Sequence, residues 1–344
     1  MERVLEAPTA PSRVRPAGQW GFLVLLAITL FVALALAVVF GETSLTARQY
    51  LEAFARPESA SGEILWLIRS PRAVAAALTG AELGLSGAVM QGLLRNPLAD
   101  PAVLGVSAVS ALGAAVVIAL GLSAAAGSIE AAALFGALAC GALVVFLAAR
   151  FSEPEMLILF GVAISAVGAA ATALVFNLSS SLVTTAEILS WLLGSVANRD
   201  WSDVALSLIP ALAGAALCAF SARGIRMLTL GEETASVSGL PMARLRAFAV
   251  AGAALLTGAS VAMAGVIGFV GLAAPHLVRW RVRDDPAATL APSALAGAVL
   301  VLLADLAARL IPTEEELRLG VVTALFGAPL FALVAWRAAR SWRA

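Results

Sequence analysis

Residues 20–40 read WGFLVLLAITLFVALALAVVF and contain no charged side chain. A helix needs roughly 20 apolar residues to cross the hydrocarbon core of a bilayer, so this run is long enough for one crossing. The alternative, a cleaved secretory signal, would have an apolar core of only about 7–15 residues. The length therefore favours an uncleaved first span, preceded by an arginine-bearing tail over residues 1–19 that we expect to be cytoplasmic.

The composition extends this conclusion to the whole chain. Of its 344 residues, 61% are hydrophobic and 13% are charged, whereas soluble domains usually carry about 25% charged residues. Further apolar segments predict spans at about 72–94, 101–121, 129–149, 156–177, 203–222, 244–264, 266–282, 288–310 and 320–337. We therefore expect an all-α polytopic membrane protein of about ten transmembrane helices, in a single domain over residues 20–344. The weakest predictions are the two spans over 244–282, because only Gly265 and Gly268 interrupt that stretch.

The placement of arginine predicts the orientation of the helices. With the N-terminus in the cytoplasm, 15 arginines fall on the inside and 7 on the outside, which is the bias that the positive-inside rule describes. The outside residues are Arg48, Arg56, Arg69, Arg72, Arg199, Arg309 and Arg318. Merging the two weak spans would move Arg279–Arg283 outside. The bias therefore supports ten spans with both termini in the cytoplasm.

Two sets of short matches indicate an internal repeat. The sequence LTGA occurs at 78–81 and at 256–259. Other matches keep their spacing, and they pair Gly87 with Gly265, Pro97 with Pro275, Gly161 with Gly320, and Gly168 with Gly327. The two copies are five spans apart and so have opposite orientations, and inverted repeats are typical of transporters. We expect spans 2–5 and 7–10 to form such a repeat; chance matching in a chain rich in glycine and alanine is the alternative.

The reactive residues exclude several classes of function. All 22 basic residues are arginine, and a Walker A phosphate loop needs a lysine, so ATP hydrolysis is expected on another chain. His276 is the only histidine, and Cys140 and Cys218 lie in apolar runs without disulfide or metal-ligand spacing. The nucleophile–base sets that catalysis needs are missing, and a net charge of zero gives no reason to expect nucleic acid. We expect no enzyme activity, no cofactor and no metal site.

Two acidic residues fall within predicted spans. Asp305 precedes Arg309 by four residues, so the two share a helix face and can form an ion pair. Glu82 lies near the middle of the second span, where a carboxylate costs roughly 3 kcal/mol on insertion scales. It should therefore face protein or water, either protonated or paired. A role for Glu82 in a transport pathway is the alternative.

Polar segments interrupt the apolar pattern at the predicted cytoplasmic side. Residues 91–101 read QGLLRNPLADP and form either a constriction of a pathway or an ordinary turn. The longest inside loop, about 221–246, contains LGEETASVSGLP at 230–241. Gly231 and Gly239 bracket a predicted short helix whose first turn carries Glu232. Such a helix suits docking to another protein, and a plain solvated loop is the alternative.

On the predicted outer side, three serines at 179–181 precede a short apolar segment over 182–194. This segment is expected to be a helix at the outer surface. The hydroxyl groups either line an outer gate or cap that helix.

Taken in order along the chain, these landmarks resemble the permeases of type II ABC importers for iron–siderophores, haem and cobalamin, often called the FecCD family. The resemblance covers nearly the whole chain after the first span. It is carried by RSPR at 69–72, QG at 91–92, RNPLADP at 95–101, LGVS at 104–107, WLLGS at 191–195, GFVGL at 268–272, PH at 275–276, LAD at 303–305, GVVTA at 320–324 and GAP at 327–329.

The resemblance implies a homodimer of ten-helix subunits in the bacterial inner membrane, importing by alternating access. Two cytoplasmic ABC ATPase subunits would drive it, and an extracytoplasmic binding protein would deliver an iron–siderophore, with haem or cobalamin as alternatives. The residues that match the family's functional positions are Arg69, Arg72 and Arg309 for binding-protein docking, Gly231, Glu232, Ala235 and Gly239 for ATPase coupling, Asn96 and Leu98 for a cytoplasmic gate, and Ser180 and Ser181 for an outer gate.

Glu82 and the acidic loop over 313–317 depart from what the family pattern leads us to expect. The main rival is a secondary transporter driven by an ion gradient, which inverted repeats would also fit and in which Glu82 and Asp305 would carry protons. A second rival is a membrane scaffold that transports nothing.

Overall fold

The computed structural model describes residues 16–41, 43–151, 154–179, 181–282, 285–311 and 316–341, and helices are the only regular structure within them. The long helices are α1 (Pro16–Val39), α4 (Ser70–Leu93), α6 (Ser128–Arg150), α7 (Pro154–Leu178), α9 (Trp201–Met227), α11 (Met242–Ala264), α13 (Pro286–Leu310) and α14 (Leu319–Ser341). The shorter elements are α2 (Ala47–Ala55), α3 (Ala60–Glu63), η1 (Ile64–Arg69), η2 (Pro101–Leu104), α5 (Val106–Ala119), α8 (Leu182–Leu192), η3 (Leu228–Leu230), α10 (Glu232–Val237) and α12 (Val270–Arg279).

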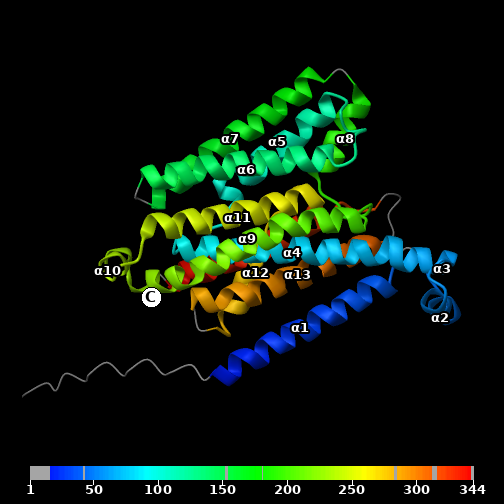
Figure 1. Ribbon diagram of the computed structural model, residues 1–344, viewed down its shortest axis with the longest axis horizontal. Coiled ribbons are helices and arrows are strands. Elements are labelled where there is room, and N and C mark those ends of the chain that lie inside the picture. The colour runs from blue at the N-terminus through cyan, green and yellow to red at the C-terminus, as the bar shows by residue number, and fades with distance from the viewer. Residues whose placement is uncertain are drawn as a thin grey trace, which may run out of the picture.

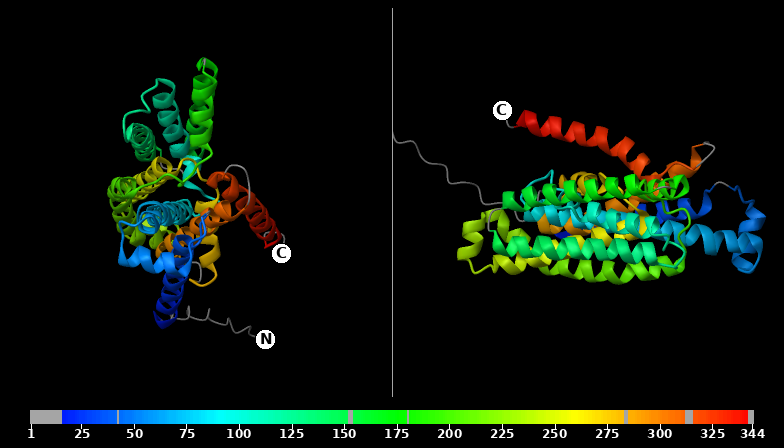
Figure 2. Two further views of the ribbon diagram at one scale, coloured as in Figure 1. Left: turned by 90° about the vertical axis from the view of Figure 1, so that its right-hand side faces the viewer. Right: turned by 90° about the horizontal axis from the view of Figure 1, so that it is seen from above.

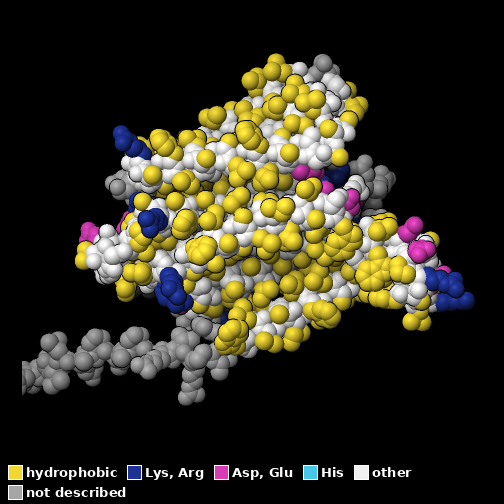
Figure 3. Space-filling view, viewed as in Figure 1, with side chains coloured by type: hydrophobic (Ala, Val, Ile, Leu, Met, Phe, Trp, Pro, Cys, Tyr) yellow, Lys and Arg dark blue, Asp and Glu magenta, His cyan; other side chains and the backbone are white. Residues whose placement is uncertain are grey.

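The long helices run along one axis and form a bundle (Figure 1). Seven helical stretches of the described chain are long and apolar enough to cross a membrane. Hydrophobic side chains cover the length of the bundle, and charged side chains gather toward its two ends (Figure 3). An apolar band between charged ends is what a bilayer requires of a spanning protein. The prediction of an all-α polytopic membrane protein is therefore confirmed.

The second span differs from its prediction because it starts earlier. α3, η1 and α4 form one uninterrupted helical stretch over Ala60–Leu93, 34 residues long, which is about 51 Å at 1.5 Å per residue. The sequence predicted a span over 72–94. A hydrocarbon core is only about 30 Å thick, so this stretch extends beyond it. Arg69 and Arg72 lie on the half of the stretch where it begins.

Two predicted spans, 101–121 and 266–282, are not continuous α-helices. In the first, Gly105 has a φ of 83° and separates η2 from α5. In the second, the backbone is non-helical from Gly265 (φ 72°) to Phe269 (φ 67°), and α12 has only 10 residues, about 15 Å. The prediction of a full-length helix over 266–282 is therefore wrong. Glycine permits the positive φ that ends the preceding helix, and non-helical backbone is tolerated at this depth where protein covers it.

The two ends of the bundle differ in what they carry (Figure 1). One end, which we call the α10 end, holds α10, the start of α1 and the end of α14. The other, which we call the α8 end, holds α2, α3, α8 and the start of α4. Figure 2 shows that α14 leaves the rest of the bundle at an angle.

The inverted repeat is visible in the helix packing. α4 starts at the α8 end and α11 starts at the α10 end, so they run in opposite directions through the bundle (Figure 1). In the predicted repeat, α4 (span 2) corresponds to α11 (span 7), and α13 (span 9) corresponds to α6 (span 4). α4 packs against α13, and α11 packs against α6, so the two packed pairs are equivalent. A Cβ atom on Gly80 would lie 2.2 Å from the Gly297 carbonyl oxygen, and one on Gly258 would lie 2.4 Å from the Ala137 Cβ. The two LTGA motifs therefore place matched glycines at matched close crossings.

The second set of matches follows the same rule. A Cβ atom on Gly161 of α7 would lie 2.3 Å from the carbonyl oxygen of Val103 in η2. A Cβ atom on Gly320 of α14 would lie 2.8 Å from the carbonyl oxygen of Val266, in the non-helical stretch before α12. α7 (span 5) thus approaches the interrupted start of span 3 through Gly161. α14 (span 10) approaches the interrupted start of span 8 through the equivalent Gly320. These contacts agree with the predicted repeat, but the predicted match of Gly87 with Gly265 does not correspond in structure, because Gly87 lies inside α4 and Gly265 ends α11.

Candidate functional site

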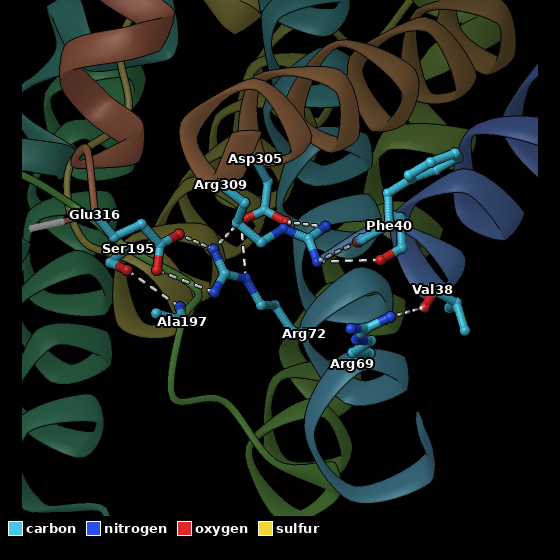
Figure 4. Close-up of polar contacts among 10 residues, drawn as sticks. Val38, Phe40, Arg69, Arg72, Ser195, Ala197, Asp305, Arg309 and Glu316 are labelled. Atoms are coloured by element: carbon cyan, nitrogen blue, oxygen red, sulfur yellow. Dashed lines mark hydrogen bonds and ion pairs between the residues drawn. The ribbon is translucent and has the colours of Figure 1, made fainter. Parts of the chain in front are cut away.

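Five charged side chains meet at the α8 end, and we call them the arginine cluster (Figure 4). Arg69 ends η1, and Arg72 lies in the first turn of α4. Asp305 and Arg309 lie in the last two turns of α13. Glu316 lies in the segment that leads into α14. Three parts of the chain, far apart in sequence, therefore supply one cluster of opposite charges.

Asp305 is the centre of the cluster. Its carboxylate accepts hydrogen bonds from Arg72 Nε at 3.0 Å and Arg72 Nη2 at 2.8 Å, and it lies 2.9 Å from Arg309 Nη2. Asp305 is 1% exposed and Arg72 is 7% exposed. The predicted pair between Asp305 and Arg309 is confirmed. The second partner, Arg72, was not predicted, because 233 residues separate it from Asp305 and no helical spacing links them.

Arg72 has a further carboxylate partner in Glu316. Arg72 Nη1 donates to Glu316 Oε2 at 3.1 Å, and Arg72 Nη2 contacts the other oxygen, so the pair is bidentate. The Glu316 side chain is 22% exposed. Sequence reasoning missed Glu316, because a loop residue has no periodicity that would assign it to a face. The signals that the sequence offers are the acidic loop over 313–317, to which Glu316 belongs, and its position just before the GVVTA motif.

Arg69 and Arg309 donate hydrogen bonds to carbonyl oxygens at the C-terminal end of α1. Arg69 Nη1 donates to the Val39 carbonyl oxygen at 2.7 Å and to the Tyr50 hydroxyl at 3.1 Å. Arg309 Nη1 donates to the carbonyl oxygen of Phe40 at 3.3 Å. The last carbonyl groups of a helix have no partners within the helix, and cations near them are favourable. Both guanidinium groups therefore cap α1.

The segment 316–320 is also fixed to the loop after α8. The Leu319 N–H donates to the Gly194 carbonyl oxygen at 3.0 Å, and the Gly320 N–H donates to the Leu193 carbonyl oxygen at 3.0 Å. Glu316 thus stands at one end of a short segment whose other end is bound to the α8 loop. The arginine cluster connects α1, α4, α13 and this segment.

The three arginines predicted to dock a binding protein are therefore brought together, and in this conformation they face inward. Arg69, Arg72 and Arg309 are all buried, and each has partners within the chain. Removing one partner of a buried ion pair costs about 3–5 kcal/mol, because an uncompensated charge stays behind. The cluster as it stands contributes to the packing of the α8 end.

A hydrogen-bonded cap also orders this end. Asp200 precedes α9, and its carboxylate accepts from the N–H groups of Ser202 at 2.8 Å and Asp203 at 3.0 Å. The Asp203 carboxylate accepts in return from the Asp200 N–H at 3.1 Å, which completes a capping box. The hydrogen bond from the Ser202 hydroxyl, followed by that from the Asp203 N–H, lowers the pKa of the Asp200 carboxyl.

At the α10 end, the predicted short helix is present. α10 spans Glu232–Val237 and is bracketed by Gly231 (φ 96°) and Gly239 (φ 87°). Ala235 packs inward, Val237 is 90% exposed, and the Glu232 carboxylate pairs with Arg246 of α11. The predicted loop over 221–246 is shorter than expected, because α9 continues to Met227 and α11 begins at Met242. The apolar periodicity of both helices ends before their helical backbone does.

A polar cavity of about 470 Å³ lies beside α10. It is lined by the ends of α4, α9 and α12, and its polar lining includes Gln91, Arg95 and Arg279. Arg279 Nη2 donates to Gln91 Oε1 at 2.6 Å. Sequence reasoning did not connect Gln91 with Arg279, because they are 188 residues apart.

The predicted gate residues occupy ordinary turn and cap positions. The Asn96 Oδ1 accepts from the Leu98 N–H at 2.9 Å, which is a self-contained turn. Leu98 lies beside Phe269 of the stretch before α12 and Phe331 of α14. The Ser181 hydroxyl caps α8 by accepting from the Thr184 N–H at 3.3 Å. Ser180 lies outside the described residues.

Glu82 faces protein, as the cost of a carboxylate at this depth predicts. It is 2% exposed, and one carboxylate oxygen accepts from the Ser207 hydroxyl of α9 at 3.3 Å. The other oxygen has no hydrogen-bond partner among the described residues. Ser207 also lines a cavity of about 200 Å³ between α6, α9 and α11.

Comparison with known proteins gives one consistent result. The model of the FecCD transport family matches residues 27–337. The vitamin B12 import system permease proteins BtuC of Salmonella paratyphi A and Salmonella typhimurium are each 38% identical to this chain over 322 residues, covering 92% of it and 95% of their own length. A solved structure assigned to a metal-chelate type ABC transporter in an inward-facing conformation has a TM-score of 0.80 and 31% identity, covering 92% of this chain and 99% of its own.

Proposed function

The chain belongs to the FecCD transport family and is the permease of an ABC importer, and we propose that its cargo is a metal chelate of the cobalamin class. It is not an enzyme, because ATP hydrolysis belongs to the ATPase subunits with which such permeases work. The observation that carries the cargo proposal is the 38% identity to vitamin B12 permeases over nearly the full length of both chains. An iron–siderophore, the first expectation from the sequence, is the second candidate, because the similar solved structure is of the metal-chelate type.

We propose that two copies of this chain form the pathway. The support is the apolar surface of α7 and α14, where Val167, Leu178, Leu325 and Phe326 are all exposed. α14 also leaves the bundle at an angle (Figure 2). Such a surface would face either lipid or a second copy, and we propose the second copy.

The coupling proposal rests on α10. An ABC permease must receive movement from its ATPase subunits, and α10 is a short helix that leaves an apolar side chain, Val237, in solvent. Its ion pair to Arg246 connects it to α11. We assign the α10 end to the cytoplasm, with both termini there, since most arginines are predicted on that side. The α8 end then faces the binding protein.

The gate proposal follows from the same orientation. Leu98 lies among aromatic side chains of the α12 and α14 regions at the α10 side, and the α8 loop is bound to the start of α14 at the other side. ATP binding and hydrolysis would move α10 and open one side while the other closes. The roles of Asn96, Leu98 and Ser181 belong to this proposal.

Uptake in cells tests the cargo. A strain without its own cobalamin and siderophore permeases would express this chain with its ATPase and binding protein, and accumulation of ⁵⁷Co-cyanocobalamin and of a ⁵⁵Fe-siderophore would be compared. We expect cobalt to accumulate. Accumulation of iron alone would transfer the assignment to siderophores. The matched control is the same strain with an ATPase whose catalytic site is inactive.

A further inference from the structure

We propose that Glu316 occupies, at Arg72, the position that a carboxylate of the binding protein takes on docking. Docking then replaces the Glu316 carboxylate with that of the binding protein. This inference rests on the proposed function, because it requires a binding protein that docks at the α8 end. An acidic partner group and Arg72 as one of its targets are already implied by the family resemblance, and what the structure adds is a carboxylate of this chain, Glu316, at Arg72 before docking.

Of the two carboxylates on Arg72, only Glu316 is placed for exchange. Asp305 is 1% exposed, lies on a helix and is shared between Arg72 and Arg309. The Glu316 side chain is 22% exposed and lies on a non-helical segment. Figure 4 shows the two carboxylates on different sides of the Arg72 guanidinium. A partner group arriving from solvent can therefore replace Glu316 and leave Asp305 in place.

The charges of the cluster favour an acidic partner. Three arginines face two carboxylates, and the charge of Arg69 is met by carbonyl oxygens and the Tyr50 hydroxyl. If Glu316 moves away, the positive excess rises from one charge to two. Leaving Arg72 with one fewer partner in a buried site is costly, whereas an exchange keeps the number of its ion pairs constant. The exchange therefore avoids the penalty that simple opening would incur.

The exchange also has a structural consequence. Glu316 ties the segment 316–320 to α4, and the same segment is bound to the α8 loop at Gly194 and leads into α14. Once Glu316 leaves Arg72, one of the two attachments of this segment is lost. Docking at Arg72 is thereby linked to the loop after α8 and to the start of α14, which we propose form the outer gate.

Two measurements on the complete complex in lipid nanodiscs test the exchange. The first needs no binding protein: the rate at which phenylglyoxal modifies Arg72, read by mass spectrometry. We expect Glu316→Gln to raise this rate several-fold and Glu58→Gln to leave it unchanged. Glu58 is an exposed carboxylate between α2 and α3 at the same end.

The second measurement is the affinity for the binding protein of the same transport system. We expect Glu316→Gln to bind it about five- to tenfold more tightly, because the competing internal carboxylate is removed, and we expect the gain to shrink at high salt. Glu316→Asp, which keeps the charge on a shorter side chain, should lie between the two. It also provides a folded variant if Glu316→Gln fails to assemble.

The outcomes separate the two proposals. If the wild-type complex neither binds the binding protein nor hydrolyses ATP faster in its presence, the proposed function fails and the exchange fails with it. If the wild-type complex responds but Glu316→Gln changes neither Arg72 labelling nor affinity, the proposed function stands and the exchange is overturned.

Discussion

The two ends of the bundle present different surfaces. At the α8 end, Arg69, Arg72 and Arg309 are buried and paired within the chain. At the α10 end, a six-residue helix stands in solvent with Val237 90% exposed. The difference indicates that the α8 end must rearrange before its arginines can meet a partner, whereas the α10 end presents its contact surface already formed. Changes at the first end should therefore cost stability, and changes at the second should cost partner binding alone.

The largest effect is expected from Asp305→Asn. The substitution leaves Arg72 and Arg309 without their shared buried charge, and we expect a loss of about 3–5 kcal/mol in stability. Thermal unfolding of the detergent-purified protein measures the loss, with Glu58→Gln as the exposed control. An unchanged melting temperature would show that the arginine cluster does not stabilise the α8 end.

A smaller effect, of a different kind, is expected from Val237→Glu. The new charge falls on the exposed end of α10 and should weaken association with the ATPase subunit by about tenfold or more, as loss of a central apolar contact does at other interfaces. The melting temperature of the isolated permease should not change. Surface plasmon resonance with the ATPase measures the first quantity, and Val183→Glu, at an exposed position of α8 at the other end of the bundle, serves as the control for association. If Val237→Glu binds the ATPase as the wild type does, α10 is not the coupling surface.

The smallest effect is expected from Asp200→Ala. Loss of this N-cap should cost about 1 kcal/mol at neutral pH. Hydrogen bonds lower the pKa of Asp200 in the folded protein, so its stabilising contribution is present above the ordinary aspartate pKa and is lost as the pH falls through the lowered value. The melting temperatures of wild type and variant should therefore differ at pH 7 and converge in acid. A difference that stays constant with pH would mean that the carboxylate charge is not what stabilises this cap.

The sequence predicted the features that depend on local spacing or on composition. The pair between Asp305 and Arg309 follows from helical spacing, α10 follows from Gly231 and Gly239, and the inverted repeat follows from matched glycines. The first two can be deduced from a few neighbouring residues, and the third from short matches that keep their internal spacing. The structure confirms the ion pair and α10, and the close contacts of the matched glycines agree with the repeat.

The features that sequence reasoning missed depend on long-range contacts. Arg72 meets Asp305 across 233 residues, and Glu316 reaches Arg72 from a loop without periodicity. The short α12 was missed because an apolar run does not reveal whether its backbone is helical. The inward orientation of the three arginines was missed for the same reason, since position in a chain does not report burial.

We propose that this chain transports only as the permease of an ATP-driven importer. Proteoliposomes containing the purified chain would be supplied with its ATPase, its binding protein and ⁵⁷Co-cyanocobalamin, with and without ATP, and compared with proteoliposomes that hold the chain alone under an imposed proton gradient. We expect uptake that requires the ATPase, ATP and the binding protein together. Uptake by the chain alone under the proton gradient would contradict it and would favour a secondary transporter.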